Sequence, residues 1–402
     1  MIFSHRAIGI AFFFIVVILT IQLFRLHGVS TIRHDVGSQF SSEASSDVLN
    51  NTLGFQKIFV INLPERTDRR DAMTLAAALT SLQVTWAKGV PGTDVPDKVV
   101  PGEDWEKPIL RGNKGSWRAH MNVLNTIIDQ NLASALILED DADWDTRLKS
   151  QLQIFARAAQ PFTQPNPRRV SIPIDPSKVT NLPITSIPSP PIQPSSSSPY
   201  GTNWDVLWLG HCGTNFPTSA TLNLPPTNTS LLRVTIPNDP TVPSPQHLKA
   251  HPFALQDQLA ELYPPHTRVV HPSSGTICTQ AYAVSQQGAR KLLWRFGVQE
   301  ALMKGWDSIL GEWCDGLFVN VKNGEGGQGK KENGGTGPVC VTVQPPLFSH
   351  HFGRGAASDI TAPGGGFVNR EKEMTPYVRW SVRLNMGRLV EGGEVRDQWP
   401  DE

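Results

Sequence analysis

The sequence has no excess charge of either sign, because 36 lysine and arginine residues balance 36 aspartate and glutamate residues over 402 positions. Without a basic excess, nothing points to a nucleic-acid partner, and without an acidic excess the chain does not resemble a disordered solvating tail. No internal repeat is visible. The length is sufficient to bury the core of one large domain or two smaller ones.

Cysteine is also scarce, with four residues in the chain: Cys212, Cys278, Cys314 and Cys340. Four cysteines allow three full pairings, and the sequence does not choose among them; four buried free thiols are the alternative. Two triplets have the pattern of N-glycosylation acceptors, Asn50-Asn51-Thr52 and Asn228-Thr229-Ser230. Each triplet is a weak signal alone, but together with the cysteines they favour a body that faces the secretory lumen.

One long apolar run stands near the N-terminus, at Ala7–Phe24, between Arg6 and Arg25. A helix needs about 20 apolar residues to cross a bilayer and tolerates roughly 17. The alternative is a cleaved signal peptide, but the apolar core of such peptides is shorter, and no small-residue cleavage pattern follows closely. Basic residues on both sides leave the orientation open. With the acceptor triplets, we expect a single-pass type II membrane protein of the Golgi or endoplasmic reticulum with a lumenal catalytic domain.

The rest of the chain divides by composition. Residues 1–25 form the expected anchor, 26–55 a serine-rich flexible stem, 56–355 the folded domain, and 356–402 a C-terminal tail. Three stretches rich in proline or glycine are expected to be disordered insertions, near 161–199, 217–252 and 323–338. The first contains eleven prolines, a density that excludes a helix or a central strand.

Apolar patterning in the first part of the domain predicts alternating strands and helices. The predicted elements are a strand at Lys57–Leu63, a helix from Thr67 to about Leu82, a strand at Val84–Ala87, a helix at Ser116–Gln130 and a strand at Ala135–Leu138. Ordered segments are expected again at Trp204–Gly210, Thr276–Val284, Ser285–Phe296 and Cys340–Val343. The alternation predicts one α/β domain with a mostly parallel sheet covered by helices.

An acidic cluster follows the strand at Ala135–Leu138 directly, and it contains Glu139, Asp140, Asp141 and Asp143. Carboxylates this crowded stay ionised together only when a cation or positive groups neutralise them. Oxygen-rich sites suit Mg²⁺ or Mn²⁺, and the carboxyl ends of strands are where open α/β sheets bind ligands. The cluster is therefore predicted to hold a divalent metal; the alternative is a solvated turn with helix-capping aspartates.

A second polar set follows the first strand, and it consists of Asn62, Arg66, Arg69 and Arg70. Guanidinium groups match phosphate geometry, and the N-terminus of a helix adds a favourable dipole. We expect these residues to bind a nucleotide diphosphate. The alternative is that the arginines pair with aspartates of their own helix on a solvated face.

Histidines and carboxylates elsewhere complete the candidate set. His120 is expected either to contact the donor or to be a core histidine, because it lies on the apolar stripe of its helix. His350 and His351 follow a late strand, and His351 is the candidate for completing a metal shell. Asp307 and Asp315 are candidate general bases, with a helix cap or a solvated carboxylate as the alternative.

Four segments resemble, in order, the motifs of glycosyltransferase family 25, which includes bacterial lipooligosaccharide and animal collagen galactosyltransferases. They are Phe59–Arg70, Leu136–Ala142, Ala281–Leu292 and Val343–His351. The resemblance implies a GT-A-like fold that binds a nucleotide sugar, a UDP-sugar donor, and inversion at the sugar carbon. One departure is that the cysteine and serine of the family's helix motif are replaced before His120, which puts the acceptor side in doubt.

These observations predict a membrane-anchored glycosyltransferase that moves a hexose, with galactose the candidate, from a nucleotide sugar to a hydroxyl of a glycan or glycoprotein. Mn²⁺ or Mg²⁺ is the expected cofactor, and Asp307 is the favoured base. Two other functions remain open: a catalytically silent, membrane-tethered binding protein on the same fold, and a metal-dependent phosphoesterase.

Overall fold

A computed structural model of the chain describes residues 48–101, 109–164, 175, 177–188, 198–221, 223, 227, 229–299, 304–318, 337–354, 359 and 372–401. The predicted anchor at residues 1–25 and residues 26–47 of the predicted stem lie outside the described residues. Residues 48–55 of the predicted stem are described, and Val48, Leu53 and Phe55 belong to the core, so this part is not a flexible stem. Within the described ranges, no helix combines the length and the apolar character needed to cross a bilayer.

Strands and helices alternate in the first half of the domain, and strands dominate its middle. The strands are β1 (Lys57–Asn62), β2 (Val84–Lys88), β3 (Ser134–Glu139), β4 (Ala142–Trp144), β5 (Thr180–Pro183), β6 (Val206–Gly210), β7 (Leu232–Ile236), β8 (Arg268–Pro272), β9 (Ala281–Ser285), β10 (Cys340–Gln344) and β11 (Phe348–His350). The helices are α2 (Thr67–Leu79), α3 (Arg111–Asp129), α4 (Leu148–Thr163), α5 (Leu259–Leu262), α6 (Gln286–Trp294), α7 (Trp306–Cys314) and α8 (Met386–Val390). Short 3₁₀ turns lie at Gly92–Asp94, Asp97–Val99, Ile184–Ser186 and Pro245–His247, and a π turn at Arg295–Gln299 follows α6.

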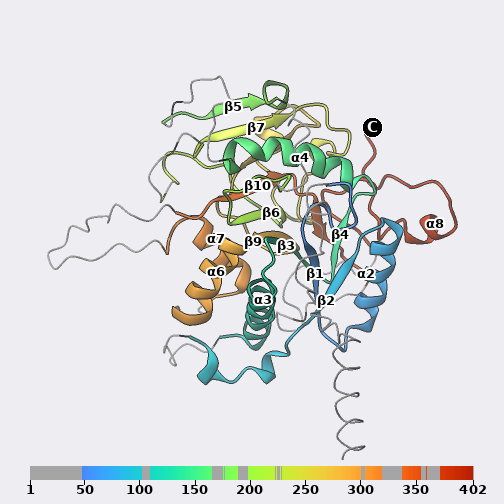
Figure 1. Cartoon of the computed structure of the whole chain (residues 1–402). Helices are drawn as coiled ribbons and strands as arrows, with labels where there is room; N and C mark the ends of the chain where they lie inside the picture. The colour runs from blue at the N-terminus through green and yellow to red at the C-terminus, as the bar shows by residue number, and fades with distance from the viewer. Residues whose placement is uncertain are drawn as a thin grey trace, which may run out of the picture. The chain divides into compact units, whose positions relative to one another are not determined.

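One large sheet runs through the domain (Figure 1) in the order β2-β1-β3-β9-β6-β10-β8-β7-β5, and β11 joins β6 and β4 at its side. β1 is parallel to β2 and β3, and β6 is parallel to β10 and β11. β9 lies antiparallel between β3 and β6. The predicted α/β class is confirmed, but the sheet combines parallel and antiparallel pairs and is not mostly parallel. β8 is antiparallel to both of its neighbours, β7 and β10.

Helices cover both faces of the sheet, and the alternation of side chains along each strand builds two cores. In β3, Leu136 and Leu138 belong to one core with residues of α2 and α4, whereas Ala135 and Ile137 belong to the other with residues of α3, α6 and α7. These strand side chains are fully buried on both faces. This explains why the strand reads as a continuous apolar run rather than an alternating one.

The first Pro-rich stretch is not a purely disordered insertion, because part of it adds regular structure to the domain. α4 continues to Thr163 with Pro161 inside it, and β5 pairs in parallel with β7 as the last strand of the sheet. Proline is tolerated at such an edge because one side of the strand needs no ladder partner. The second stretch likewise contains β7. In the third, residues 323–336 lie outside the described residues.

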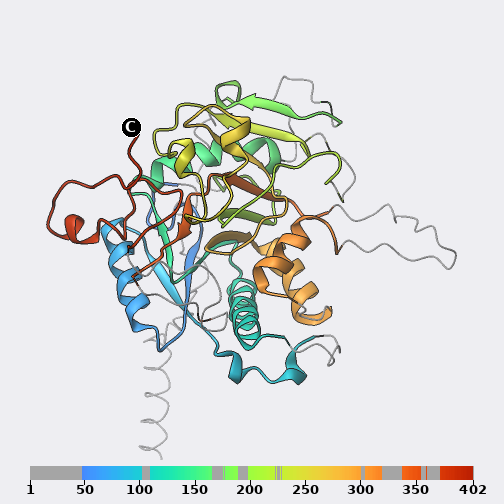
Figure 2. The same cartoon turned by 180° about the vertical axis from the view of Figure 1, so that it is seen from behind.

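The C-terminal region also differs from the predicted tail. Residues 372–401 pack on the domain, and α8 lies beside α2 (Figure 2). The amide of Val382 donates to the carbonyl of Trp144 at 2.9 Å, and the amide of Thr146 donates to the carbonyl of Trp380 at 3.0 Å. These bonds bring the segment against β4, directly beyond the acidic cluster.

The cysteines form two disulfides, Cys212–Cys278 and Cys314–Cys340, with no free thiol. Of the three pairings that the sequence allowed, the structure selects the one that links β6 to β9 and α7 to β10. The interpretation of four free thiols is therefore wrong.

The first glycosylation triplet lies in a tight turn. Oδ1 of Asn50 accepts hydrogen bonds from the amides of Thr52 and Gly54, and its Nδ2, the atom to which a glycan would be attached, is buried. In the folded protein this acceptor is covered. Asn228, of the second triplet, lies outside the described residues.

The contribution of the Pro-rich stretch to the core can be tested at Leu182. This side chain is 1% exposed, so Leu182→Ala should lower the free energy of unfolding by about 2–4 kcal/mol through lost burial and a cavity. Val179→Ala in the same stretch is the control, since Val179 is 43% exposed and the change should cost less than about 0.5 kcal/mol. Chemical denaturation of both variants provides the measurement. Equal stability of the two would mean that this strand does not pack on the core.

Candidate functional site

The candidate residues gather where the strands end. β1 ends at Asn62 and its parallel neighbour β3 ends at Glu139, with Ile61 in register with Glu139. Because β9 is antiparallel to β3, the residues that precede β9 arrive at this same edge. β6 also ends here, at Gly210, beside the start of β9. The edge therefore combines segments that are far apart in the sequence.

Asp140 and Asp141 form the centre of the site, and Arg69 joins them. Nη1 of Arg69, from the first turns of α2, lies 2.8 Å from Oδ1 of Asp140 and 2.8 Å from Oδ2 of Asp141. On its other side Asp140 accepts a hydrogen bond from Nδ2 of Asn62 at 2.8 Å. Asn62 at the end of β1 and Arg69 at the start of α2 are thus both bonded to the acidic residues that follow β3.

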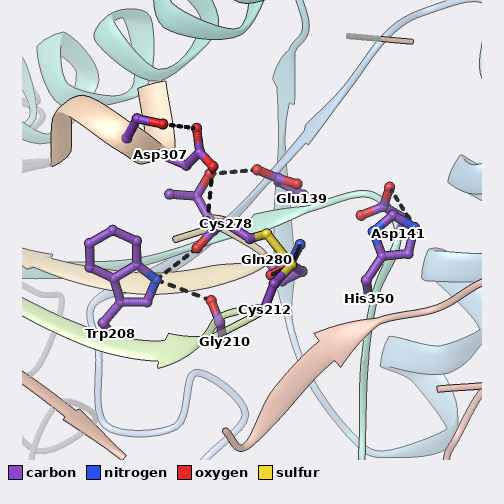
Figure 3. The surroundings of a disulfide bond; sticks show 11 residues. Glu139, Asp141, Trp208, Gly210, Cys212, Cys278, Gln280, Asp307 and His350 are labelled. Atoms are coloured by element: carbon purple, nitrogen blue, oxygen red, sulfur yellow. Dashed lines mark hydrogen bonds and ion pairs between the residues drawn. A yellow bond between two sulfur atoms is a disulfide. The ribbon is translucent and has the colours of Figure 1, made fainter. Parts of the chain in front are cut away.

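Two oxygen atoms at this centre have no hydrogen-bond partner although they are buried. They are Oδ1 of Asp141 and Oδ1 of Asn62. Asp141 is 9% exposed, and Nε2 of His350 lies 3.8 Å from its other oxygen, Oδ2 (Figure 3). A buried carboxylate oxygen without a donor is costly, so these atoms indicate a position that a ligand can satisfy.

Asp143 faces away from this centre and is fully occupied. Its Oδ1 accepts from the amides of Trp144 and Arg383, and its Oδ2 accepts from the hydroxyls of Thr375 and Ser381. The side chain is completely buried. With four donors on its two oxygens, Asp143 fixes the C-terminal segment to β4, and we leave it out of the proposed metal ligands.

Arg383 is the site residue that the sequence analysis missed. Its Nε donates to the carbonyl of Ala142 at 2.9 Å, and its Nη2 donates to the carbonyl of Asp140 at 2.6 Å. It lies in the segment predicted as a tail, and no motif marks it. The signal that could have found it is charge: four adjacent carboxylates after a buried strand require cations from somewhere in the chain.

The positive groups around the acidic turn affect which of its carboxyl groups are ionised. Burial raises the pKa of Asp141, but the charges of His350, Arg69 and Arg383 outweigh burial and lower that pKa to about 2. Glu139 behaves in the opposite way, since burial and the neighbouring charge of Asp141 raise its pKa to about 8. Asp141 is therefore ionised at neutral pH, whereas Glu139 retains its proton.

Glu139 lies between the acidic pair and Asp307. Its Oε1 accepts from the hydroxyl of Thr279 at 2.6 Å, and the amide of Cys278 donates to Oδ2 of Asp307 at 3.1 Å (Figure 3). The Cys212–Cys278 disulfide thus holds the loop that orients both carboxyl groups. Asp307 at the start of α7 belongs to the same edge as the acidic cluster.

Asp315, the other candidate base, lies at the opposite end of α7. Its carboxylate accepts from the amide of Gly275 at 3.1 Å, and burial raises its pKa. The contact fixes a loop, and no described group of the acidic cluster contacts it. Asp307 is therefore the better placed of the two candidates.

His120 is buried in the core between α3, α7 and β9. Its Nδ1 lies 2.8 Å from the hydroxyl of Tyr282, and its ring stacks on Trp306 at 5.5 Å. Burial lowers its pKa to about 3, so the ring is neutral. The alternative of a core histidine agrees with these contacts, and we leave His120 out of the proposed donor site.

The remaining candidates divide by their contacts. Arg66 pairs with Asp68 at 2.7 Å and with Asp359, whose carboxylate also lies 3.9 Å from Arg69. The guanidinium of Arg70 lies 4.3 Å from the ring of Trp86 instead, on the solvated side of α2. Arg66 and Arg69 thus share an anionic partner, and Arg70 does not.

His351 turns away from the acidic pair. Its Nδ1 lies 3.1 Å from the hydroxyl of Thr375, and burial lowers its pKa to about 4. Its amide donates to the carbonyl of Asp141 at 2.9 Å, and its Nδ1 lies 4.0 Å from Oδ2 of Asp143, on the far side of the turn from the acidic pair. Of the two adjacent histidines, His350 has its ring near the acidic pair.

In the described part of the chain, no three histidine, cysteine, aspartate or glutamate side chains are grouped closely enough to hold a metal ion. The acidic pair fits a divalent cation in chemistry, because it offers anionic oxygens and one of them is buried without a partner. Arg69 now takes part of the space between the two carboxylates. A cation there requires that this guanidinium move.

Comparison with known proteins finds similarity in the part of the chain that contains Asn62, Arg69 and the acidic pair. Residues 55–178 match the model of glycosyltransferase family 25 (LPS biosynthesis protein). Procollagen galactosyltransferase 1 of Danio rerio is 31% identical over 119 residues, which cover 27% of this chain and 20% of that protein. Procollagen galactosyltransferase 2 of Homo sapiens is 29% identical over 111 residues, covering 25% and 18%. A glycosyltransferase 25 family member of Anopheles gambiae is 29% identical over 126 residues, covering 29% and 20%. The chain spans about a fifth of the length of these curated relatives.

The role assigned to Asp143 can be tested by Asp143→Asn. The change removes a charged acceptor of four hydrogen bonds, so the free energy of unfolding should fall by about 1–3 kcal/mol. Asp71→Asn, on the exposed face of α2, is the control and should change stability by less than about 0.5 kcal/mol. Thermal and urea unfolding give the values. If Asp143→Asn kept full stability and instead lost Mn²⁺ binding, Asp143 would be a metal ligand after all.

Proposed function

We propose that this chain is a glycosyltransferase, because residues 55–178, which include the first two of the four motif segments, match the model of glycosyltransferase family 25. It transfers a hexose from a nucleotide-sugar donor to a hydroxyl group of a glycan or glycoprotein. The single observation that carries the proposal is the carboxylate pair Asp140 and Asp141, with Arg69 on the pair and Arg383 on its backbone, at the carboxyl edge of the sheet. That combination of anionic oxygens and guanidinium groups is what a metal–diphosphate donor needs.

Asp140 and Asp141 would hold the divalent cation, Mn²⁺ or Mg²⁺, and His350 is the nearest imidazole. When bound, the cation supplies counter-charge for the leaving diphosphate. The turn that presents the two carboxylates is fixed by Arg383 through two backbone carbonyls. Preorganised charge of this kind does not have to rearrange as the sugar–phosphate bond breaks.

Arg66 and Arg69 are the proposed diphosphate ligands. They already share the carboxylate of Asp359, which supports an anion-binding role for the pair. Both lie in the first turn of α2 or just before it, where the helix dipole also favours negative charge. Asn62 contributes a buried carbonyl oxygen without a partner, which can accept a hydrogen bond from the nucleotide. The UDP part of the donor is proposed from the family resemblance.

Asp307 is the proposed general base that removes the proton from the acceptor hydroxyl. The amide of Cys278 fixes one oxygen of its carboxylate. Direct displacement by that hydroxyl would invert the sugar carbon, as the resemblance implies. Two of the three relatives described above are named procollagen galactosyltransferases, so galactose is the first donor sugar to test.

We also propose that the enzyme works in the lumen of the secretory pathway, with Ala7–Phe24 as its membrane anchor. Two disulfides and no free cysteine support an oxidising compartment. The anchor rests on the sequence pattern alone.

Asp141→Asn tests the metal-binding part of the proposal. We expect transfer to fall on the order of 10²–10³-fold, because the leaving diphosphate loses counter-charge. Without metal the variant should still fold, with somewhat lower stability, because the positive groups that lower the pKa of Asp141 lose an anionic partner. The assay measures transfer and donor hydrolysis for a panel of nucleotide sugars, with and without Mn²⁺, alongside melting temperature. Wild-type turnover in the variant would rule out this use of the acidic pair, and donor hydrolysis without an acceptor dependence would favour a phosphoesterase.

Asp307→Asn tests the assignment of the base. It should lower kcat by about 10²–10⁴-fold while leaving donor binding and Mn²⁺-induced stabilisation intact. Asp315→Asn is the matched control on the same helix, because asparagine can still accept the hydrogen bond from Gly275. Steady-state kinetics of both variants decide the question. If Asp315→Asn were the more damaging change, the two roles would have to be exchanged.

A further inference from the structure

The acidic turn compensates its own charge without a bound ion. Glu139 accepts a hydrogen bond from Thr279, Asp143 accepts four hydrogen bonds, and Asp140 and Asp141 share one guanidinium. Nη1 of Arg69 is 2.8 Å from an oxygen of each aspartate. A single cationic nitrogen is therefore placed between the two carboxylates that are proposed to bind a divalent cation.

The neighbouring arginines do not share this position. Arg66 is engaged with Asp68 and Asp359, and Arg70 lies over Trp86. Arg383 bonds to carbonyl oxygens of the turn, not to the two carboxylates. Arg383 can remain in place whatever binds, whereas Arg69 cannot, because a cation coordinated by both aspartates needs the space of its Nη1.

A second observation points to a ligand here. Oδ1 of Asp141 is buried and has no partner, although Oδ2 of the same carboxylate meets both Arg69 and His350. Arg69 thus satisfies the pair incompletely. A divalent cation, which binds several oxygens at once, could use the oxygen that Arg69 leaves unpaired.

We propose, building on the function proposed above, that Arg69 is a built-in counter-ion that competes with the divalent cation for Asp140 and Asp141. In the free protein it occupies the acidic pair and keeps affinity for the cation alone low. The donor diphosphate draws the guanidinium away, and the cation then enters. The cation and the nucleotide diphosphate therefore bind cooperatively, because each removes the obstacle to the other.

The surroundings of Arg69 provide the alternative anion position that this exchange needs. Its Nη2 lies 3.9 Å from the carboxylate of Asp359, which also pairs with Arg66. A guanidinium has five donors in a planar fork, so it can contact an anion on one edge while its other edge leaves the aspartates. A diphosphate placed against Arg66 and Arg69 would meet the same edge.

The proposal predicts an outcome opposite to that of a permanent structural ion pair. If Arg69 only fixes α2 to the turn, its loss should loosen the turn and weaken cation binding. If Arg69 competes with the cation, its loss should strengthen binding of Mn²⁺ alone and weaken binding of the nucleotide diphosphate. The two results differ in sign, so they can be separated without measuring catalysis.

The experiment uses the purified chain with Arg69→Gln, Arg69→Lys and the control Arg70→Gln. Electron paramagnetic resonance of free Mn²⁺ gives the Kd for Mn²⁺ alone, and calorimetry gives the Kd for UDP with and without Mn²⁺. For Arg69→Gln we expect Mn²⁺ alone to bind on the order of tenfold tighter, within the usual range of coupling between two ligands. UDP should bind several-fold more weakly, and the cooperativity between the two ligands should disappear.

Arg69→Lys distinguishes displacement of a bridging guanidinium from a general effect of positive charge on Mn²⁺ binding. Lysine keeps the positive charge but has no planar fork to bridge two carboxylates, so its Kd for Mn²⁺ should lie between those of wild type and Arg69→Gln. Equal Mn²⁺ affinity of wild type and Arg69→Lys, with tighter binding only in Arg69→Gln, would show a general charge effect and overturn the displacement. Arg70→Gln should bind both ligands as the wild type does.

Asp141→Asn separates failure of this inference from failure of the proposed function. If the wild type binds Mn²⁺ and Asp141→Asn does not, the metal site stands, and unchanged or weaker Mn²⁺ binding by a folded Arg69→Gln overturns the inference alone. If the wild type binds no Mn²⁺ even with UDP, the metal-dependent function itself fails. Should Arg69→Gln not fold, the wild type still decides: Mn²⁺ binding that UDP does not strengthen contradicts the competition.

Discussion

The crowding of four carboxylates between Glu139 and Asp143 is the constraint on which the rest of the site depends. Buried like charges are tolerated only when protons, hydrogen bonds or cations compensate them. The protein uses all three: a proton on Glu139, four donors on Asp143, and Arg69 on the remaining pair. Each solution recruits a different part of the chain, so α2, the loop before β9 and the C-terminal segment all converge on one turn.

Directions of the strands explain why these parts can meet. β1 and β3 run in parallel and end together, and antiparallel β9 starts where they end. Side chains at a strand end, a helix start and a loop therefore share one edge, as ligand sites in α/β sheets commonly do. The disulfide between Cys212 and Cys278 then ties β6 to the start of β9 and limits movement of the loop that orients Asp307. A rigid frame of this kind suits chemistry that depends on preorganised charge.

The arginines that compensate the charge of the turn are of two kinds, one that stays fixed and one that a ligand can replace. Arg383 bonds to main-chain carbonyls, and so it can hold the turn in every state of the site. Arg69 bonds to the carboxylates themselves, and so it occupies the oxygens that a ligand would use. The same residue type thus serves as a support in one place and as a stand-in for a ligand in the other, and the atoms that it contacts make the difference.

The sequence by itself determined the α/β class, the first strands and helices, and the cluster at Glu139–Asp143, because apolar periodicity and local charge are properties of neighbouring residues. It also proposed Asn62, Arg66 and Arg69 as ligand-binding residues, from their position at or soon after the end of the first strand. Only the tertiary structure decided that Asp143 bonds to the C-terminal segment and His120 to Tyr282, that His350 rather than His351 has its ring near the acidic pair, and that Arg383 bonds to the turn. The disulfide pairing and the antiparallel direction of strands such as β9 could likewise not be predicted from patterns of neighbouring residues. Asp143 and Arg383 are 240 residues apart, and no sequence pattern around either residue predicts their contact. The contact depends on the path by which the C-terminal segment returns to the sheet.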